Sequence, residues 1–457
     1  MRYSRILYGG TARFQGLGGA FGAVGADFSA IATNPAGLGL YSSSEFTFSP
    51  LLRMSNTLSN YNGETNRDNR FNAGMGDLGL VFNIKPKNST SLRNFNFAFG
   101  MNRQNNFSNR VVIEGVNNKS SLLTQYVGIL NNDYLTPNDI NDRYGFDISL
   151  AYNTDLIFLK DSANRIYAND APNGGVIQRK TIRTSGSINE FDFAFGANLN
   201  DRFYFGVTIG IPVIRYYETS NYEEFKNDTS VHYFQSMRYN QELQTQGSGL
   251  NLKLGIIYRP ADWVRIGAAV HTPTYYGNMR DNWNSSMDAE FDYSITNSSS
   301  SPLGTYDYEL TTPFRAIGSV AFIIGKIGLI SGEYEYVDYS QSEFSADDDF
   351  SDINREIQHK YGSPVNFRFG TEWRIQNFLV RGGAGYYGSP YKNSINTGEI
   401  YTGSLGLGYR AKHFFFDLAY QWSQMKEDYY LYDPSLVNAT NLTSTTNTLT
   451  ATLGVRF

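Results

Sequence analysis

Apolar and polar residues alternate along much of this chain with a period of two. From Phe414 to Trp422, the sequence FFFDLAYQW places aromatic or aliphatic side chains at every second position, with Asp417 and Gln421 between them. The segment 449–457, LTATLGVRF, continues the alternation to its last residue. Successive side chains of a strand point to opposite faces, so the pattern predicts strands with one apolar face and one face that tolerates water.

The same alternation recurs in fourteen segments. Most of them reach the roughly 9–11 residues that a tilted strand needs to cross the hydrocarbon layer of a membrane. The segments are 44–58, 72–84, 93–105, 184–199, 202–217, 243–259, 263–275, 306–324, 327–341, 364–376, 379–388, 398–410, 413–427 and 443–457.

The connections between these segments alternate between short and long. Short connections are 200–201, 260–262, 325–326 and 411–412, and long ones are 106–183, 218–242, 276–305, 342–363 and 428–442. Outer-membrane barrels have short turns at one rim and long loops at the other. A secreted β-sandwich, the alternative, gives no reason for this difference because both of its ends face the same solvent. The pattern therefore predicts an all-β fold, a 14-stranded antiparallel transmembrane β-barrel formed by residues 43–457.

Some segments within the long connections carry other patterns. Residues 146–158 also read as a strand, but a fifteenth strand would place the chain ends on opposite rims, so we assign them to the second loop. Short helices are expected at 121–130 and at 352–360, the latter with Ser351 as its N-cap.

The composition agrees with a barrel and excludes several other classes. The 457 residues include 34 Tyr, 32 Phe and 44 Gly, and only 18% are charged. The best apolar run, 316–325, is cut by Lys326 and is too short for a transmembrane helix. A hydrophobic content of 41% argues against disorder, and a net charge of −5 supplies no basic surface for nucleic acid. The absence of cysteine excludes disulfides and thiolate metal sites.

Residues 1–42 do not follow the alternation. No apolar stretch follows the basic start Met1–Arg5, so we expect a mature chain from which a secretion leader has been removed. A run of small apolar residues, 16–26, precedes Asp27, which is expected to cap a short helix over 28–33. Such a segment has too little apolar area to fold alone. We expect residues 1–42 to pack inside the barrel as a hatch.

The run GLGGAFGAVGADFSAIATNPAGLGLYSSSEFTFSP, residues 16–50, resembles the hatch and first strand of the outer-membrane long-chain fatty acid transporter (FadL/TodX) family. Its most specific element is Asn34-Pro35-Ala36-Gly37, which follows the small residues and Asp27. The final LTATLGVRF resembles the C-terminal assembly signal of bacterial outer-membrane proteins. The likeness covers about the first fifty residues in detail and the whole chain in architecture, and it implies the outer membrane of a Gram-negative bacterium.

The resemblance implies uptake of hydrophobic molecules. In this scheme, ligands are caught among the outer loops, pass into a pocket against the hatch and leave sideways into the lipid, where an inward kink breaks the third strand. Gly100 is the residue expected at that kink, since glycine within a strand often marks a bulge or bend. Release would follow a spontaneous rearrangement of the hatch.

Two sets of side chains are candidates for sites in the lumen. Charged residues at inward positions of neighbouring strands either pair with one another and hold the hatch or select solutes as in porins. They are Glu333, Glu335, Arg368, Glu372, Arg374 and Arg381. Apolar and aromatic residues near the amino end either line a ligand pocket or simply pack inside the barrel. They are Tyr3, Ile6, Leu7, Tyr8 and Phe14.

No motif in the sequence indicates catalysis. The histidines are scattered singly, and no spacing motif places one of them as a base beside a nucleophile. They are His232, His271, His359 and His413. The glycine-rich run lacks the Gly-Lys-Ser/Thr ending of a phosphate-binding loop. We therefore expect no enzymatic activity, no metal and no cofactor.

The leading hypothesis is a passive outer-membrane channel for hydrophobic compounds such as long-chain fatty acids, closed by residues 1–42. One alternative uses the same barrel as an anchor or shuttle for surface-protein export, with a protein partner bound by the long loops. Another is an aqueous porin, which would conduct ions where a closed apolar route would not.

Overall fold

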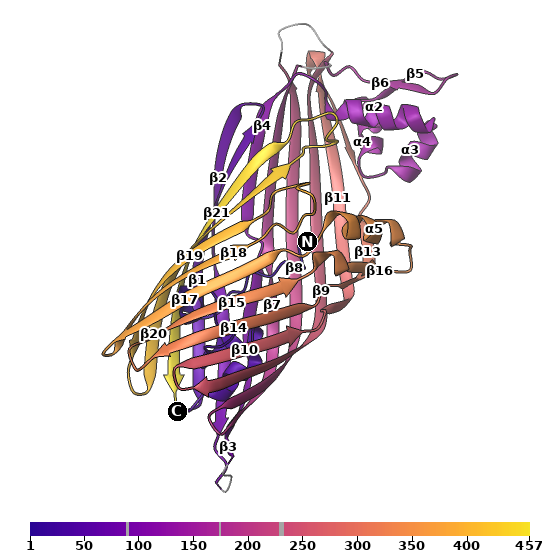
Figure 1. Ribbon diagram of the computed structural model, residues 1–457. Coiled ribbons are helices and arrows are strands. Elements are labelled where there is room, and N and C mark those ends of the chain that lie inside the picture. Colours follow the sequence, from indigo (N-terminus) through magenta and orange to yellow (C-terminus); the bar gives the residue numbers. More distant parts are fainter. Residues whose placement is uncertain (88–90, 173–174, 228–232) are drawn as a thin grey trace.

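In the computed structural model, antiparallel strands form a sheet that closes on itself (Figure 1). Within the described residues, fourteen strands follow one another around a barrel, which confirms the expected architecture. The last strand pairs with the first, from Glu45 opposite Arg456 to Asn60 opposite Asn441. Closure satisfies the backbone groups of both strands, as a sheet in lipid requires. The described ranges are 1–87, 91–172, 175–227 and 233–457.

Several of the fourteen strands are interrupted partway along their length. A strand and its continuation after the interruption carry separate labels, joined here by "with". The strands are β1 (Glu45–Tyr61), β2 (Glu64–Ile84), β3 (Leu92–Asn106) with β4 (Asn109–Asn117), β7 (Val176–Leu199), β8 (Phe203–Lys226), β9 (Phe234–Ala261), β10 (Val264–His271) with β11 (Tyr275–Phe291), β13 (Gly304–Thr311) with β14 (Arg315–Ile324), β15 (Gly328–Val337) with β16 (Glu343–Ser345), β17 (Val365–Ile375), β18 (Phe378–Tyr387), β19 (Ile400–Arg410), β20 (Phe414–Tyr429) and β21 (Thr440–Arg456).

The two ends of the barrel differ as the loop lengths predict. Short turns such as 200–202 and 376–377 lie at the end that holds the C-terminus (Figure 1). The opposite end carries a helical layer with a small two-stranded sheet. Its elements are α2 (Leu122–Asp133), α3 (Pro137–Arg143), α4 (Ile148–Asn153), β5 (Phe158–Asp161) and β6 (Ile166–Ala168). A further helix, α5 (Ser351–Lys360), lies beside β13 and β16.

The two helices predicted in the loops are present as α2 and α5, although α5 begins at Ser351 itself and is preceded by Phe350. α3 and α4 were not predicted, and α4 occupies part of 146–158, which belongs to the second loop as expected. The prediction of loops at 218–242 and 276–305 is wrong. Strands β8, β9 and β11 continue through most of them, and β12 (Ile295–Ser300) folds back on β11. These strand extensions stand beyond the apolar band, so polar residues replace apolar ones on their outer face and weaken the signal. On their inner face, residues such as Met237, Tyr239 and Met287 are buried in an apolar cluster.

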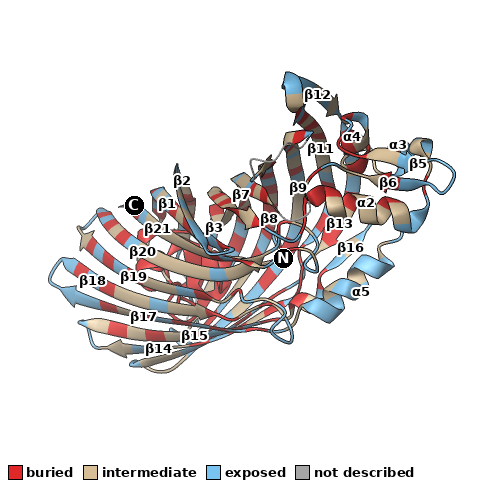
Figure 2. Cartoon of the chain, turned by 90° about the horizontal axis from the view of Figure 1, so that it is seen from above, coloured by how far each residue is buried: buried red, intermediate tan, exposed pale blue. Residues whose placement is uncertain are grey.

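A band of apolar side chains surrounds the barrel. On β9, the exposed positions from Leu250 to Tyr258 are all apolar, whereas Asn251 and Lys253 between them are buried. At about 3.3 Å per residue, this stretch approaches the thickness of a bilayer's hydrocarbon core. Seen from above, buried and exposed residues alternate along the strands that enclose the lumen (Figure 2). No helix in the described ranges is long and apolar enough to cross a membrane.

Residues 1–42, named here the inner segment, pack within the barrel. The segment contains α1 (Ala12–Gly16) and the 3₁₀ helices η1 (Phe28–Ala32) and η2 (Pro35–Leu40). Asp27 caps η1, as the sequence predicts, by accepting a hydrogen bond from the Ser29 amide at 3.0 Å. Phe28, Ile31, Leu38 and Tyr41 form a buried cluster with barrel residues Val81, Ala98 and Ala194. The barrel wall thus supplies the apolar contacts that the segment lacks by itself.

The position of the apolar band predicts the effect of a charge placed on the wall. Leu254→Arg lies in the middle of the exposed apolar stretch of β9, so we expect it to lower the free energy of unfolding in lipid vesicles by about 2–4 kcal/mol. Gln246→Arg, beyond the band on the same strand, should cost only about 0–1 kcal/mol. Guanidinium titration of the folded barrel measures both, and equal losses would contradict this placement of the band.

Candidate functional site

The Asn34-Pro35-Ala36-Gly37 motif ties the inner segment both to itself and to the barrel. Asn34 accepts a hydrogen bond from the Ala36 amide at 3.1 Å, which caps η2. Its side-chain amide donates to the carbonyl oxygens of Gly22 at 2.6 Å and Ile256, on β9, at 3.3 Å. One short side chain therefore holds two turns of the segment against the wall.

A row of glycines on three adjacent strands forms the seat for this motif. Gly196, Gly206 and Gly255 are register partners across β7, β8 and β9. A Cβ atom at Gly206 would overlap the backbone of Pro35, and one at Gly255 would overlap the side chain of Asn34. Sequence reasoning missed this seat. Its signal is a glycine at an inward position in each of three neighbouring strands.

Ion pairs hold the first half of the inner segment. Arg13 donates to both carboxylate oxygens of Glu372, at 3.0 and 3.1 Å. Arg381 pairs with Glu372 at 2.6 Å and with Asp417 at 2.7 Å. Burial raises the pKa of Asp27 in the same region, although Thr11 and Arg13 favour its charged form. Buried pairs of this kind position groups more than they stabilise a fold.

A second charge cluster lies on β14, β15 and β17. Arg368 donates to Glu333 at 2.8 Å and to Glu335 at 2.7 Å, and Arg315 pairs with Glu335 at 2.7 Å. Glu333 also accepts a hydrogen bond from the Gly22 amide at 2.5 Å, so it contacts the inner segment directly.

Arg374 does not belong to this cluster. It is exposed at the short-turn end and donates to the Gln376 carbonyl at 2.8 Å, because β17 ends at the next residue, Ile375.

A third cluster was not anticipated from the sequence. Lys253 on β9 is buried and pairs with Glu190 and with Asp192, the latter at 3.2 Å. His271, also buried, contacts the Thr33 carbonyl through Nε2 at 2.8 Å. The signal was available, since Glu190 and Asp192 alternate with phenylalanines in β7. All three clusters mix positive and negative charge, as expected for structural pairing.

The third strand does not kink at Gly100. Its register with β2 runs without interruption from Phe95 to Asn102. A Cβ atom at Gly100 would overlap the Leu78 carbonyl oxygen of β2 and would lie 2.5 Å from the Phe28 ring of the inner segment. Close packing against both the neighbouring strand and the inner segment therefore explains the glycine.

The interruption in the third strand lies further along, at residues 107–108 between β3 and β4. In the described ranges, backbone pairing between β2 and the third strand ends at Asp77 opposite Asn102. Beyond it, β4 leans over the inner face of β1, where Ser59 donates to the Val112 carbonyl at 2.5 Å. Only side chains join β2 to the third strand there, as in the Asp68–Arg110 pair at 2.9 Å. We call this stretch, where the wall lacks backbone pairing, the β2–β3 gap.

The start of the inner segment lies at the β2–β3 gap. The Leu7 amide donates to the Gln104 carbonyl at 3.1 Å, and the Gly9 amide donates to the Arg103 carbonyl at 2.8 Å. A Cβ atom on Gly76, where β2 bulges, would lie 2.6 Å from the Gly10 carbonyl oxygen. Residues 7–10 therefore cover the gap from inside.

An aromatic pocket of about 390 Å³ opens beside the first residues of the chain. Its rings come from the inner segment, from β13 and from the region between β15 and β17. They belong to Tyr3, Tyr306, Tyr308, Tyr339, Phe344, Phe350 and Tyr361. Tyr3 also makes edge contacts with Phe107 and Tyr216, with ring centroids 6.0 and 6.1 Å away. Tyr3 thus stands between this pocket and the interruption of the third strand.

The other candidate residues near the amino end are dispersed. Leu7 and Tyr8 line a separate cavity of about 80 Å³, and Phe14 packs on Phe21 at 5.4 Å within the inner segment. Ile6 is half-buried and lines neither cavity.

The other described histidines are exposed. His359 is on the exposed face of α5, His413 lies at the short-turn end, and His232 falls outside the described residues. Among the described residues, no cluster of His, Asp and Glu has the arrangement of a metal site.

Solved structures with a similar fold include a FadL homologue and toluene transporters. The chain aligns with a Pseudomonas aeruginosa FadL homologue over 99% of both chains, with a TM-score of 0.60 and 11% identity. The alignment with the Pseudomonas putida toluene transporter TodX has a TM-score of 0.56 and 10% identity, over 98% of this chain and 99% of TodX. The alignment with the Ralstonia pickettii toluene transporter TbuX has a TM-score of 0.53 and 15% identity, over 98% of both chains. At these identities the likeness establishes the fold. No protein-family model and no curated protein sequence matches the chain.

The glycine seat predicts a sensitive position in the barrel wall. Gly206→Ala should displace Pro35, because overpacking destabilises the local structure by about 1–3 kcal/mol. We expect this loss to speed hydrogen exchange of residues 28–40 roughly fivefold to a hundredfold. Gly318→Ala is the matched control, because a Cβ atom there meets nothing within 4 Å. Mass spectrometry of exchanged peptides measures both variants. Unchanged exchange in Gly206→Ala would show that the seat does not hold the segment.

Proposed function

We propose that this chain, which has the fold of the FadL and TodX channels, is a passive outer-membrane channel for hydrophobic compounds, closed by its inner segment. One observation carries the proposal: Tyr3 separates an aromatic pocket from a gap in the barrel wall, and the residues that follow Tyr3 cover that gap. In this function the inner segment is a hatch.

The pocket suits an apolar ligand of modest size. Its volume of about 390 Å³ lies in the range of small-molecule sites, roughly 300–1,000 Å³. Aromatic residues make up half of its lining, and burial of apolar ligand surface against their rings contributes about 25 cal/mol per Å². Aromatic hydrocarbons, which the names of TodX and TbuX indicate as their cargo, and the chains of fatty acids both have this chemistry.

The contacts of the hatch indicate which part of it moves. The amides of Leu7 and Gly9 each make one hydrogen bond to β3, and such bonds contribute about 0.5–1.5 kcal/mol each. Arg315 also donates to the Ser4 carbonyl, and Arg2 forms a partly exposed ion pair with Glu218 at 3.1 Å. Displacing the helical part would instead break the largely buried Arg13–Glu372 pair, at about 3–5 kcal/mol. The contacts of residues 1–10 are separate and individually weaker, so we infer that these residues are the mobile element and that the remainder stays seated on the wall.

Movement of residues 1–10 would open a path from the pocket to the lipid. The outer surface next to the β2–β3 gap is apolar, with Leu78, Phe82 and Phe99 exposed. A ligand that leaves here enters the bilayer without crossing water, which favours apolar cargo. A surface-protein anchor would need neither the aromatic pocket nor the gap. A porin would need an open lumen, and the seated inner segment fills it.

A reversible tether tests the movement of the hatch. The Ser4 and Ser342 hydroxyl oxygens are 3.2 Å apart, and the chain has no cysteine of its own. In Ser4→Cys/Ser342→Cys, a disulfide should hold residue 4 in place. We expect oxidation to lower uptake of labelled fatty acid or toluene at least tenfold and reduction to restore it.

The single variant Ser4→Cys, treated with the same oxidant, is the control and should transport at the wild-type rate. If the tethered double variant also transported at that rate, the hatch would not need to move and the proposed mechanism would fail.

A further inference from the structure

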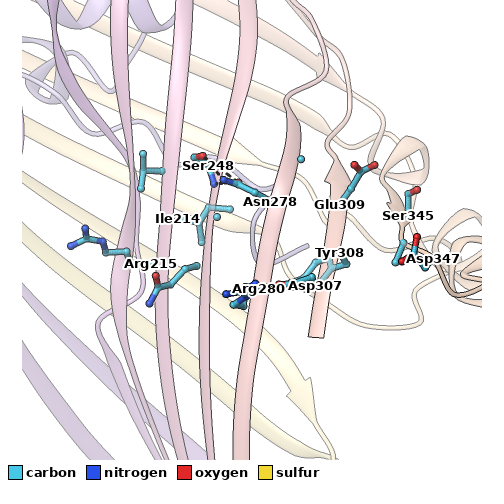
Figure 3. A pocket seen from close by; sticks show the side chains of 15 residues that line it. Ile214, Arg215, Ser248, Asn278, Arg280, Asp307, Tyr308, Glu309, Ser345 and Asp347 are labelled. Atoms are coloured by element: carbon cyan, nitrogen blue, oxygen red, sulfur yellow. Dashed lines mark hydrogen bonds and ion pairs between the residues drawn. The ribbon is translucent and has the colours of Figure 1, made fainter. Parts of the chain in front are cut away.

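A second, larger cavity lies on the outside of the barrel. This outer groove, of about 840 Å³, runs across β8, β9, β11, β13 and β16 (Figure 3). Unlike the aromatic pocket, it is lined mainly by polar groups, among them Arg215, Ser248, Asn278 and Asp347. The exposed pair of Arg280 and Asp307, 2.6 Å apart, forms part of its floor.

The outer groove begins where the apolar band ends. Tyr275, exposed on β11 at the edge of the band, donates a hydrogen bond to Glu309 of the groove at 2.5 Å. Leu250 is the last exposed apolar residue on β9 before the groove residues Ser248 and Gln246. The groove therefore lies at the level of the polar headgroups in a membrane that covers the band.

The wall beside the groove is weakly closed. β13 pairs with β16 through only three register pairs, from Glu309 opposite Ser345 to Thr311 opposite Glu343. Both strands are interrupted directly below this ladder, at 312–314 and 338–342. Further down the wall, β14 and β15 pair along their whole length. We call the short β13–β16 ladder the seam.

Aromatic packing closes the seam where backbone pairing stops. The rings of Tyr306 and Phe350 lie 6.1 Å apart, those of Tyr308 and Phe344 5.7 Å, and those of Phe344 and Phe350 5.9 Å. Side-chain contacts of this kind rearrange much faster than a strand ladder separates.

The outer groove and the aromatic pocket lie back to back across the seam. Tyr308 lines both cavities. Along the seam, Glu309 and Ser345 face the groove, whereas their neighbours Leu310 and Phe344 face the pocket, because successive side chains of a strand point to opposite sides. One thin wall therefore separates a polar cavity at headgroup level from an apolar cavity in the lumen.

We propose that the seam is a side entrance, through which an amphipathic molecule passes from the outer leaflet into the aromatic pocket. Its polar head would stay in the outer groove while its apolar chain enters between the rings of the seam. The groove carries both signs of charge, in Arg215 and Arg280 and in Asp307, Glu309 and Asp347, so an uncharged polar head such as a hydroxyl fits it. This inference rests on the proposed channel function and adds to it the route of entry and the class of ligand.

A disulfide across the seam tests the entrance. Glu309 and Ser345 are register partners, and Cβ atoms of such partners are roughly 4.5–5.5 Å apart, close to the separation in a disulfide. The variant Glu309→Cys/Ser345→Cys would be assayed for uptake of labelled 1-dodecanol, an alcohol with an apolar chain. We expect uptake at least tenfold lower in the oxidised form, and within twofold of the wild type in the reduced form.

The matched control is Ser286→Cys/Ser300→Cys. These serines are also register partners, but they lie in the β11–β12 ladder away from both cavities. Oxidation of this control should leave dodecanol uptake within twofold of the wild type.

The outcomes separate the entrance from the channel function. If the oxidised seam variant took up dodecanol at the wild-type rate, the side entrance would be wrong. The channel function would still stand, because the variant would still transport. Absence of dodecanol, fatty acid and toluene uptake by the wild-type chain itself would overturn the channel function and the entrance together.

Discussion

Backbone hydrogen bonding is the constraint on which the rest of this structure depends. A sheet surrounded by lipid has no water to satisfy its N–H and C=O groups, so each strand must pair with its neighbours and the last strand must pair with the first. The contacts between β1 and β21 meet that requirement. In a wall whose backbone pairing is otherwise continuous, each interruption needs an explanation. Among the described residues, the β2–β3 gap and the seam are such interruptions, and both lie next to the aromatic pocket or to Tyr3.

The inner segment fits inside a wall that is already closed, and this fit explains much of the unusual composition. Glycines on the inner surface let the segment approach the strands, as Gly206 does for Pro35 and Gly100 for Phe28. Ion pairs then fix its orientation, because an arginine such as Arg13 reaches a buried carboxylate only in one arrangement. The first ten residues are attached by single hydrogen bonds and by the partly exposed Arg2–Glu218 pair, whereas the helical part is held by the largely buried Arg13–Glu372 pair. The division of the segment into a seated part and a movable part follows from this difference.

The period-two alternation predicted the strands well, because one face of each strand meets lipid and the apolar signal is strong there. It failed at 276–305, where β11 rises beyond the band and its outer face carries polar residues such as Arg280 and Glu290, although Met287 and Phe291 on the other face are buried in an apolar cluster. The interruption of the third strand could not be located from Gly100, since a glycine also serves close packing, and here it accommodates Phe28. Asp27 was recognised because its capping role is local, and Asn34 because its motif resembles that of a known family. Glu190 and Asp192 of the Lys253 cluster are visible as charges between phenylalanines, but their pairing depends on how β7 and β9 flank β8. The aromatic pocket joins the inner segment to strands far apart in sequence, so local patterns could not predict its composition.

Photolabelling tests the central claim most directly, namely that apolar cargo occupies the pocket beside Tyr3. The protein in lipid vesicles would be incubated with a fatty acid that carries a diazirine on its alkyl chain. Light would then activate the diazirine, and mass spectrometry would identify the labelled residues. The account predicts labels on Tyr3, Phe344 and Phe350, which line the pocket, and competition by unlabelled fatty acid. Labels confined to lipid-facing residues such as Phe367 and Phe369, without competition, would contradict it.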